Sequence, residues 1–160
     1  MKAASVRVAE ALRALGIEPE IVDFAQSTRT AEEAALAIGT SVGQIVKSLL
    51  FTAAGVPLLV LVSGRNRASL PQLSEAVGAP IERADAATVR AATGYAIGGV
   101  PPVGHATAVP VLMDEDLLGY AVVYAAAGTP NSVFPIAPRE LARVTAAMVV
   151  ALKDTGGGAG

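Results

Sequence analysis

The sequence contains no cysteine and a single histidine, His105. Without cysteine there is no disulfide bond, no thiolate nucleophile and no cysteine-ligated metal site. A lone histidine also argues against a zinc site made only of protein ligands. The sequence has no glycine-rich phosphate loop of the Walker or dinucleotide type either. We therefore expect the protein to work without a metal ion or another cofactor.

Charged residues and long apolar runs are also scarce. Only 16% of the residues are charged and the formal net charge is −2, which argues against a DNA partner and against tight, sequence-independent binding of nucleic acid. The most apolar run, residues 56–62, is much shorter than the about 20 residues that cross a bilayer. Residues 1–15 carry charges at intervals, unlike a signal peptide. We expect a cytoplasmic protein with no membrane partner.

The length of the chain and its apolar content define one domain. With 160 residues, 52% of them hydrophobic, the chain suffices for one full core and is too short for two. We assign residues 1–152 to this single domain. Residues 153–160 are dominated by glycine and small residues, which bury little and lose entropy on ordering, so we expect a disordered glycine-rich tail there.

Hydrophobic spacing and capping residues predict five helices and six strands. The helices are one within residues 1–15 with an apolar face of Val6, Ala9, Leu12 and Leu15; one capped by Thr30 and Glu33 and ended by Gly39; one capped by Ser69 and Gln72 and ended by Gly78; one from Asp85 to Thr93; and one from Pro138 to about Leu152. The strands are residues 20–24, 45–52, 57–62, 107–113, 119–125 and 132–136, the second and third forming a central hairpin. This order lacks the regular alternation of a doubly wound fold. We predict the α/β (α+β) class, with a mixed, partly closed sheet or barrel flanked by helices.

Three segments follow one another in a characteristic order. They are Gln44-Ile-Val-Lys-Ser-Leu-Leu-Phe51, Thr93-Gly-Tyr-Ala-Ile-Gly-Gly-Val-Pro-Pro-Val-Gly104 and Tyr124-Ala-Ala-Ala-Gly-Thr-Pro-Asn131. Together they resemble the YbaK family, stand-alone relatives of the editing domain inserted in bacterial prolyl-tRNA synthetase, over roughly residues 20–150. The resemblance implies a mixed α/β fold and hydrolysis of the ester between a wrong amino acid and the terminal ribose of tRNA. Relatives remove alanine, cysteine or 2-aminobutyrate from proline tRNA, so the implied partners are an aminoacyl-tRNA, above all proline tRNA, and a prolyl-tRNA synthetase.

Lys47 interrupts an apolar run, where burial of an unpaired ammonium would be costly. One interpretation is an edge-strand lysine whose side chain reaches water. The other is an ammonium that faces a cleft and binds the terminal phosphate or sugar of tRNA. Lys47 matches the lysine characteristic of the family, and the resemblance therefore implies a catalytic role.

Two glycine-containing loops are the next candidates. Gly98, Gly99 and Pro102 have the spacing of the family's glycine-x-x-x-proline loop, which could bring backbone N–H groups to the ester and stabilise an oxyanion. Gly128, Thr129 and Asn131 could bind substrate at the wall of a pocket. Either segment could instead be an ordinary turn. Cysteine-clearing relatives are expected to carry a glycine pair with a different continuation, so their substrate preference does not transfer directly.

Other residues are assigned by position. Asp114 and Phe24 are expected to contact substrate, although Asp114 could equally cap the turn that follows it. Arg65 and Arg67 form, with Lys47, a local basic group for tRNA, or else ordinary surface charge. His105 has the reference pKa of a general base, but no serine or cysteine nucleophile motif accompanies it.

The sequence contains no assignable Ser-His-Asp, Cys-His or metal set. The hypothesis is therefore substrate-assisted hydrolysis, in which the neighbouring ribose hydroxyl organises a water and the protein supplies positioning and oxyanion stabilisation. The alternative is a non-catalytic module that binds tRNA or a synthetase.

Overall fold

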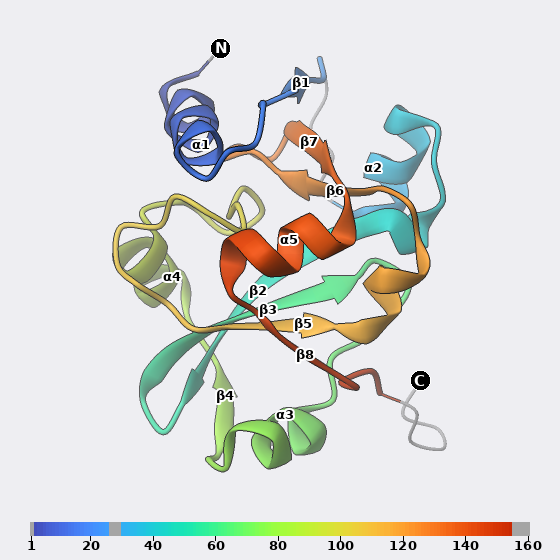
Figure 1. The fold of residues 1–160 in the computed structure, drawn as a ribbon. Helices are drawn as coiled ribbons and strands as arrows, with labels where there is room; N and C mark the ends of the chain where they lie inside the picture. The colour runs from blue at the N-terminus through green and yellow to red at the C-terminus, as the bar shows by residue number, and fades with distance from the viewer. Residues whose placement is uncertain (1, 26–29, 155–160) are drawn as a thin grey trace.

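The computed structural model describes residues 2–25 and 30–154 (Figure 1). This part of the chain forms one mixed eight-stranded sheet with helices on both faces. The strands are β1 (Val22–Asp23), β2 (Ile45–Ala53), β3 (Val56–Ser63), β4 (Ile81–Arg83), β5 (Val111–Asp114), β6 (Val123–Ala126), β7 (Ser132–Ile136) and β8 (Met148–Val150). The order across the sheet is β1-β7-β6-β2-β3-β5-β8, and β4 pairs with β2 outside this series. The predicted mixed sheet flanked by helices is confirmed, but the sheet is open and does not close into a barrel.

The predicted hairpin lies at the centre of the sheet. β2 and β3 pair antiparallel from Val46 with Ser63 to Ala53 with Val56. Ala54 and Gly55 form the turn with φ angles of 50° and 84°, the left-handed pair that matches the twist of a tight hairpin. β3 is buried on both faces. Leu59 and Leu61 belong to one hydrophobic cluster, whereas the residues that alternate with them, Leu58, Val60 and Val62, belong to another.

Three predicted helix starts are confirmed by their hydrogen bonds. In α2 (Ala31–Ile38) Thr30 accepts from the backbone N–H of Glu33, in α3 (Leu70–Val77) Ser69 accepts from that of Gln72, and in α4 (Ala86–Thr93) Asp85 accepts from that of Thr88. The capping box at α3 is only half formed. The side chain of Gln72 donates instead to the main-chain oxygen of Lys153, at 2.9 Å.

The first helix, α1 (Ala3–Ala14), is present, but its buried face differs from the predicted one. Val6 and Leu15 are exposed, and the buried residues are Ser5, Val8, Ala9 and Leu12. Ser5 belongs to this face because its hydroxyl donates to the main-chain oxygen of Ala127, at 2.8 Å. A polar residue with a hydrogen-bond partner therefore lies on the buried face of the helix.

The last predicted helix is too long. α5 (Pro138–Thr145) begins at Pro138 as expected and is followed by its C-cap, Ala146, which has a left-handed φ of 52°. Met148–Val150 then forms β8, which pairs in parallel with β5. These residues form a strand because the sheet edge offers hydrogen bonds that local helix propensity does not reveal.

Several strand bounds were also wrong. β1 has only two residues, and β5 begins only at Val111. β6 begins only at Val123, because a 3-10 helix (Glu115–Gly119) precedes it. Another 3-10 helix (Val42–Gln44) precedes β2. β4 was not predicted, since only three residues pair with β2. β7 has its predicted bounds.

The hydrophobic core has a part on each face of the sheet. α1, α4 and α5 contribute Val8, Val89 and Leu141 to the larger cluster. α3 contributes Leu73 to the cluster on the other face, where α2 also packs beside Ile45. Neighbouring residues of β2 therefore point toward different helices, as the two-residue repeat of a strand requires.

The described chain stays attached to the domain through its end. Lys153 forms a bridge with Ala68, and the N–H of Asp154 donates to the main-chain oxygen of Arg67, at 2.7 Å. The remaining residues of the expected tail, 155–160, lie outside the described residues. Across residues 2–25 and 30–154, no helix has both the length and the apolar character to cross a bilayer.

Candidate active site

The sheet is split beside β2. One edge of β2 pairs with β3 along almost its whole length. The other edge pairs with β6 at Ile45 and Val46 and with β4 from Phe51 to Ala53, so none of the described strands pairs there with residues 47–50. A cavity of about 510 Å³ lies at this split. Because the sheet is interrupted, the cavity is lined by residues from both of its faces, including Glu32 of α2 and Val89 of α4.

The three sequence motifs meet at this cavity. Lys47, Gly98 and Thr129 each line it, and each comes from a different motif. The second motif lies in close contact with the third at Gly99. A Cβ at Gly99 would lie 2.9 Å from the main-chain oxygen of Gly128 and 2.9 Å from the Cα of Thr129. Only glycine allows the second motif to lie against the third at this distance.

The two glycines of the loop have different surroundings. The N–H of Gly99 donates to the main-chain oxygen of Ala96 at 3.0 Å, which commits it to the turn. Gly98 lines the cavity with a φ of 92°, and nothing lies within 4 Å of its virtual Cβ. Of the two, Gly98 is therefore the one placed to present its backbone to a bound molecule. Pro102 is buried and does not line the cavity.

Lys47 is partly buried at the mouth of the split. Its ammonium donates a hydrogen bond to the main-chain oxygen of Asn66. Burial lowers the pKa of Lys47 from its ordinary value; Arg67 and Arg83 lower this pKa further, whereas Glu32 and Asp114 raise it. An ammonium has three donors, so Lys47 can bind a second group while it keeps Asn66.

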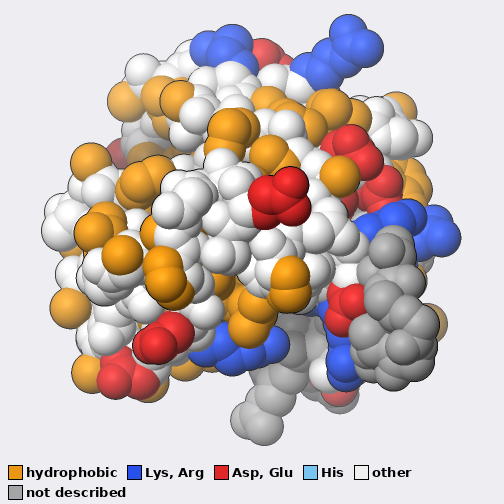
Figure 2. Space-filling view, turned by 90° about the horizontal axis from the view of Figure 1, so that it is seen from below, with side chains coloured by type: hydrophobic (Ala, Val, Ile, Leu, Met, Phe, Trp, Pro, Cys, Tyr) orange, Lys and Arg blue, Asp and Glu red, His pale blue; other side chains and the backbone are white. Residues whose placement is uncertain are grey.

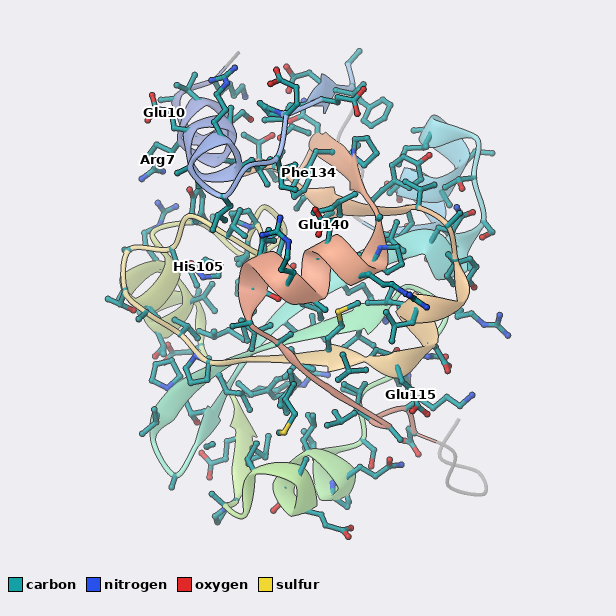
Figure 3. The ribbon with its side chains drawn as sticks, in the orientation of Figure 1. Arg7, Glu10, His105, Glu115, Phe134 and Glu140 are labelled. Atoms are coloured by element: carbon teal, nitrogen blue, oxygen red, sulfur yellow. The ribbon has the colours of Figure 1, made fainter. Side chains whose placement is uncertain are left out.

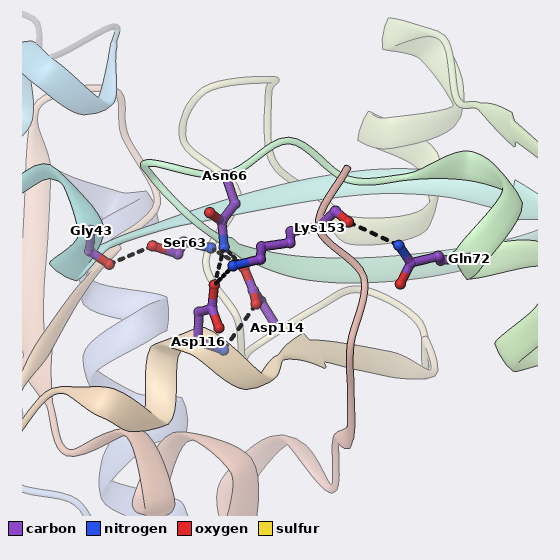
Figure 4. A network of polar contacts seen from close by, with 7 residues as sticks. All are labelled: Gly43, Ser63, Asn66, Gln72, Asp114, Asp116 and Lys153. Carbon is purple, nitrogen blue, oxygen red and sulfur yellow. Dashed lines mark hydrogen bonds and ion pairs between the residues drawn. The ribbon is translucent and has the colours of Figure 1, made fainter. Parts of the chain in front are cut away.

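Asp114 does not line the cavity. The residue is 1% exposed, and its carboxylate accepts hydrogen bonds from the backbone of Ser63 at 3.0 Å and the side-chain amide of Asn66 at 2.8 Å (Figure 4). It also accepts from the N–H of Asp116 at 3.0 Å, which confirms that it caps the following turn. Asp114 is therefore placed to hold the loop of residues 63–66 and not to contact a molecule in the cavity.

The network extends from Asp114 to the end of the described chain (Figure 4). Asp116 accepts from the side-chain amide of Asn66 at 2.8 Å and lies 3.3 Å from the ammonium of Lys153. The hydrogen bond from Asn66 is the main cause that lowers the pKa of Asp116, followed by the hydrogen bond and charge of Lys153. Two carboxylates thus fix the side chain of Asn66, whose main chain binds Lys47.

The third motif is held mainly by its own hydrogen bonds. The hydroxyl of Thr129 lies 2.6 Å from that of Ser132 and donates to the side-chain oxygen of Asn131 at 3.0 Å. Asn131 donates in turn to the main-chain oxygen of Phe24, at 2.8 Å. Thr129 lines the cavity, whereas Gly128, Asn131 and Phe24 do not.

His105 lies on the connection between α4 and β5 (Figure 3). Its Nε2 is 2.6 Å from the main-chain oxygen of Pro101, so this nitrogen carries the proton and donates. Burial lowers the pKa of His105, and the hydrogen bond to Pro101 opposes this shift. His105 does not line the cavity. Its contact instead fixes the end of the loop that carries Gly98.

The expected pair Arg65 and Arg67 is divided. A hydrogen bond with the side chain of Tyr120 is the main cause that raises the pKa of Arg65. A second cavity lies next to the first, and Arg65 lines neither of them. Arg67 lines the second cavity together with Arg83. Sequence reasoning missed Arg83 because it lies on β4, which was not predicted.

Ser48 was also missed as a single residue, although it follows Lys47 in the first motif. It lines the cavity, and its hydroxyl oxygen is buried with no hydrogen-bond partner among the described residues. A buried hydroxyl without a partner is costly, which makes it a candidate contact for a bound molecule. No group of three or more His, Cys, Asp or Glu that could hold a metal ion occurs within the described part of the chain.

Comparison with known proteins identifies the family. The family description "Aminoacyl-tRNA editing domain" matches residues 25–144. The crystal structure of "a putative trans-editing enzyme for prolyl tRNA synthetase" is similar over 96% of this chain and 99% of that chain, with 48% identity and a TM-score of 0.93. YwhH of Bacillus subtilis, an uncharacterized protein, is 32% identical over 125 residues, which are 78% of this chain and 80% of YwhH. The "Putative Cys-tRNA(Pro)/Cys-tRNA(Cys) deacylase EbsC" of Enterococcus faecalis is 26% identical over 118 residues, 72% of each chain. As the three sequence motifs predicted, the chain belongs to the aminoacyl-tRNA editing domain family.

Proposed function

We propose that this protein is a trans-acting aminoacyl-tRNA deacylase, which hydrolyses the ester of a mischarged tRNA. The observation that carries the proposal is the cavity at the split sheet, where Lys47, Gly98 and Thr129 meet. Its volume of about 510 Å³ suits an aminoacyl group with its ribose, since small-molecule sites occupy roughly 300–1,000 Å³. The relatives with editing and deacylase names support the same reaction.

The residues favour hydrolysis by a positioned water. Histidine, the usual base that activates a serine or threonine nucleophile, is absent from the described lining of the cavity. An ammonium at Lys47 would hold the sugar or phosphate, and the backbone of Gly98 would stabilise the developing oxyanion. The ribose hydroxyl beside the ester would orient the water. Positioning and electrostatics then supply the acceleration.

The proposed substrate is proline tRNA that carries a small wrong residue such as alanine, 2-aminobutyrate or cysteine. The motifs resemble those of relatives that act on such tRNA, and the name of the similar crystal structure refers to prolyl tRNA synthetase. A prolyl-tRNA synthetase would then be the partner that releases the mischarged tRNA.

The test is release of labelled amino acid from proline tRNA charged with alanine, cysteine, 2-aminobutyrate or proline. We expect selective loss of at least one small wrong residue, and an about 100-fold or greater decrease of kcat in Lys47→Ala, since a positioning contact of this kind is worth that much. His105→Ala should have a milder effect, because His105 lies outside the cavity and contacts only the end of the loop that carries Gly98. Full activity of Lys47→Ala would contradict the mechanism. Stability of all four esters together with retained tRNA binding would support a non-catalytic tRNA-binding module instead.

A further inference from the structure

A second cavity adjoins the first. It has a volume of about 930 Å³, and Lys47, Leu49 and Arg83 line both cavities. Lys47 and Leu49 are two residues apart on β2, so their side chains lie on the same face of the sheet. The opposite wall is formed by Arg67, Ala68 and the residues that begin α3. The two cavities therefore share a boundary, and the ammonium of Lys47 lies at it.

Three cations from separate segments meet at this second cavity. Lys47 comes from β2, Arg67 from the loop after β3 and Arg83 from β4. Both arginines line this cavity with Lys47, and their charge lowers its pKa. One acidic residue, Asp154, also lines the cavity. A group of like charges of this kind is stabilised by an anion that binds between them.

Positive charge is not general on the protein. The formal net charge is −2. On the face that carries α3 and β4, Lys and Arg side chains lie in separate groups among apolar and acidic ones (Figure 2). The cations at the second cavity are thus a local feature and not part of a broad basic surface.

The start of α3 adds to the same wall. Ser69, Leu70, Pro71 and Gln72 line the cavity, and they are the cap and first turn of a helix of eight residues. The positive end of the helix dipole therefore points toward the space that the three cations surround. Leu49, Leu70 and Pro71 give the cavity an apolar side as well, suited to a sugar or base.

We propose that the second cavity binds the phosphodiesters of the 3′-terminal nucleotides of tRNA, with Arg67 and Arg83 as phosphate contacts and Lys47 at the junction with the ester. The proposal rests on the proposed function, because it places the aminoacyl group in the first cavity. Phosphate contacts carry no sequence information, so their effect is to fix the position of the acceptor strand. This site replaces the predicted pair Arg65 and Arg67 by Arg67 and Arg83.

Arg65 supplies a matched control. It has the same charge as Arg67, lies two residues away in the same loop, and is directed toward Tyr120. If phosphate binding arose from diffuse surface charge, Arg65 and Arg67 would contribute equally. If the second cavity is the site, only Arg67 and Arg83 contribute.

The experiment compares Arg65→Ala, Arg67→Ala and Arg83→Ala on mischarged tRNA between 50 and 200 mM salt. We expect Arg67→Ala and Arg83→Ala each to raise KM about tenfold at low salt and to reduce the slope of log KM against log salt by about one unit, with little change in kcat. Arg65→Ala should behave like the unmodified protein. Arg83 also stacks over Phe51 at 5.9 Å, so Arg83→Lys, which keeps the charge, should restore the salt slope if charge and not packing is responsible.

Two further measurements separate this inference from the proposed function. An aminoacyl ester of adenosine has no phosphate, and its hydrolysis should be unchanged in Arg67→Ala, because Arg67 lines the second cavity and not the first. A loss in Arg67→Ala on this small substrate equal to its loss on tRNA would overturn the inference, as would equal effects of all three alanine variants on tRNA. Binding of uncharged tRNA, measured by fluorescence anisotropy, tests the site without catalysis. If no ester is hydrolysed, the proposed function fails. The phosphate site would still be supported if Arg67→Ala and Arg83→Ala bind tRNA more weakly than the unmodified protein and Arg65→Ala binds it equally well.

Discussion

Lys47 and Asp114 both bind Asn66, one at its main chain and the other at its side chain. The ammonium of Lys47 donates to the main-chain oxygen, and the buried carboxylate of Asp114 accepts from the side-chain amide at 2.8 Å. Asp114 also accepts a hydrogen bond from the backbone of Ser63, so it fixes both ends of the loop of residues 63–66. The position of the ammonium at the cavity thus depends on a carboxylate that lines neither cavity.

Asp114→Asn should therefore impair activity through Lys47. The amide keeps the size of the side chain but turns one acceptor into a donor that faces N–H groups, so the free energy of unfolding should fall by about 2 kcal/mol. A displaced Lys47 should lower kcat about tenfold or more. Urea unfolding and deacylation of the same samples measure both effects. Glu115→Gln, at the exposed neighbour, is the control and should change neither. A destabilised Asp114→Asn variant with full kcat would show that Lys47 is positioned by other contacts.

Gly99→Ala tests the contact between the second and third motifs. The new Cβ would lie 2.9 Å from backbone atoms of Gly128 and Thr129, which cannot move without shifting the wall of the cavity. We expect a loss of about 1–3 kcal/mol in the free energy of unfolding and a decrease of activity beyond that of the folded fraction. Gly119→Ala provides the comparison, because nothing lies within 4 Å of its virtual Cβ. If both variants behave alike in thermal unfolding and hydrolysis, the close approach has no functional importance.

The features that the sequence predicted well are those set by residues near one another in the chain. Thr30, Ser69 and Asp85 cap helices through hydrogen bonds to the residue three positions later, so their pattern is readable locally. The hairpin of β2 and β3 is likewise fixed by two β-rich runs and a short turn. Lys47, Gly98 and Thr129, which the sequence offered from three different motifs, all line one cavity.

Features that depend on distant partners were not predictable in this way. β4 and β8 are strands only because β2 and β5 offer free edges, and their own residues carry little pattern. Arg65 and Arg67 look equivalent in sequence, but Arg65 has Tyr120 as a hydrogen-bond partner, whereas Arg67 lines a cavity together with Arg83 of β4. Asp114 looks like a candidate for the cavity in the sequence, but its carboxylate binds the loop of residues 63–66 and lines neither cavity.

Alanine substitutions at Ser48 and Ser63 should have opposite effects on the free energy of unfolding. The buried hydroxyl of Ser48 has no partner within the described residues, so Ser48→Ala should raise the free energy of unfolding by about 1 kcal/mol. Ser63 donates to the main-chain oxygen of Gly43 at 2.7 Å, and Ser63→Ala should lower the free energy of unfolding by about the same amount. If substrate binds the hydroxyl of Ser48, Ser48→Ala should also lower kcat/KM about tenfold. Unfolding in urea and hydrolysis of mischarged tRNA give the two readouts. A stabilised Ser48→Ala variant with unchanged kcat/KM would exclude this hydroxyl from substrate binding.

His105 should make the protein sensitive to acid. Burial lowers the pKa of His105 in the folded protein below its ordinary value of 6.5, whereas the unfolded chain keeps that value. Between the two pKa values the unfolded state binds more protons, so stability falls as pH decreases through about 6.5 and levels off below the folded pKa. Each unit of lowering corresponds to about 1.4 kcal/mol.

The variant for this test is His105→Gln, which does not titrate but keeps an N–H that can donate to the main-chain oxygen of Pro101. Free energies of unfolding at pH 7.5 and pH 5 should differ more in the unmodified protein than in His105→Gln, because carboxylates contribute equally to both. Since His105 fixes the end of the loop that carries Gly98, the acid-induced loss should begin there. Hydrogen exchange at pH 5 should therefore be faster in the loop of residues 94–104 of the unmodified protein than in His105→Gln. Equal pH dependence of the two proteins would mean that His105 does not control the stability of this loop.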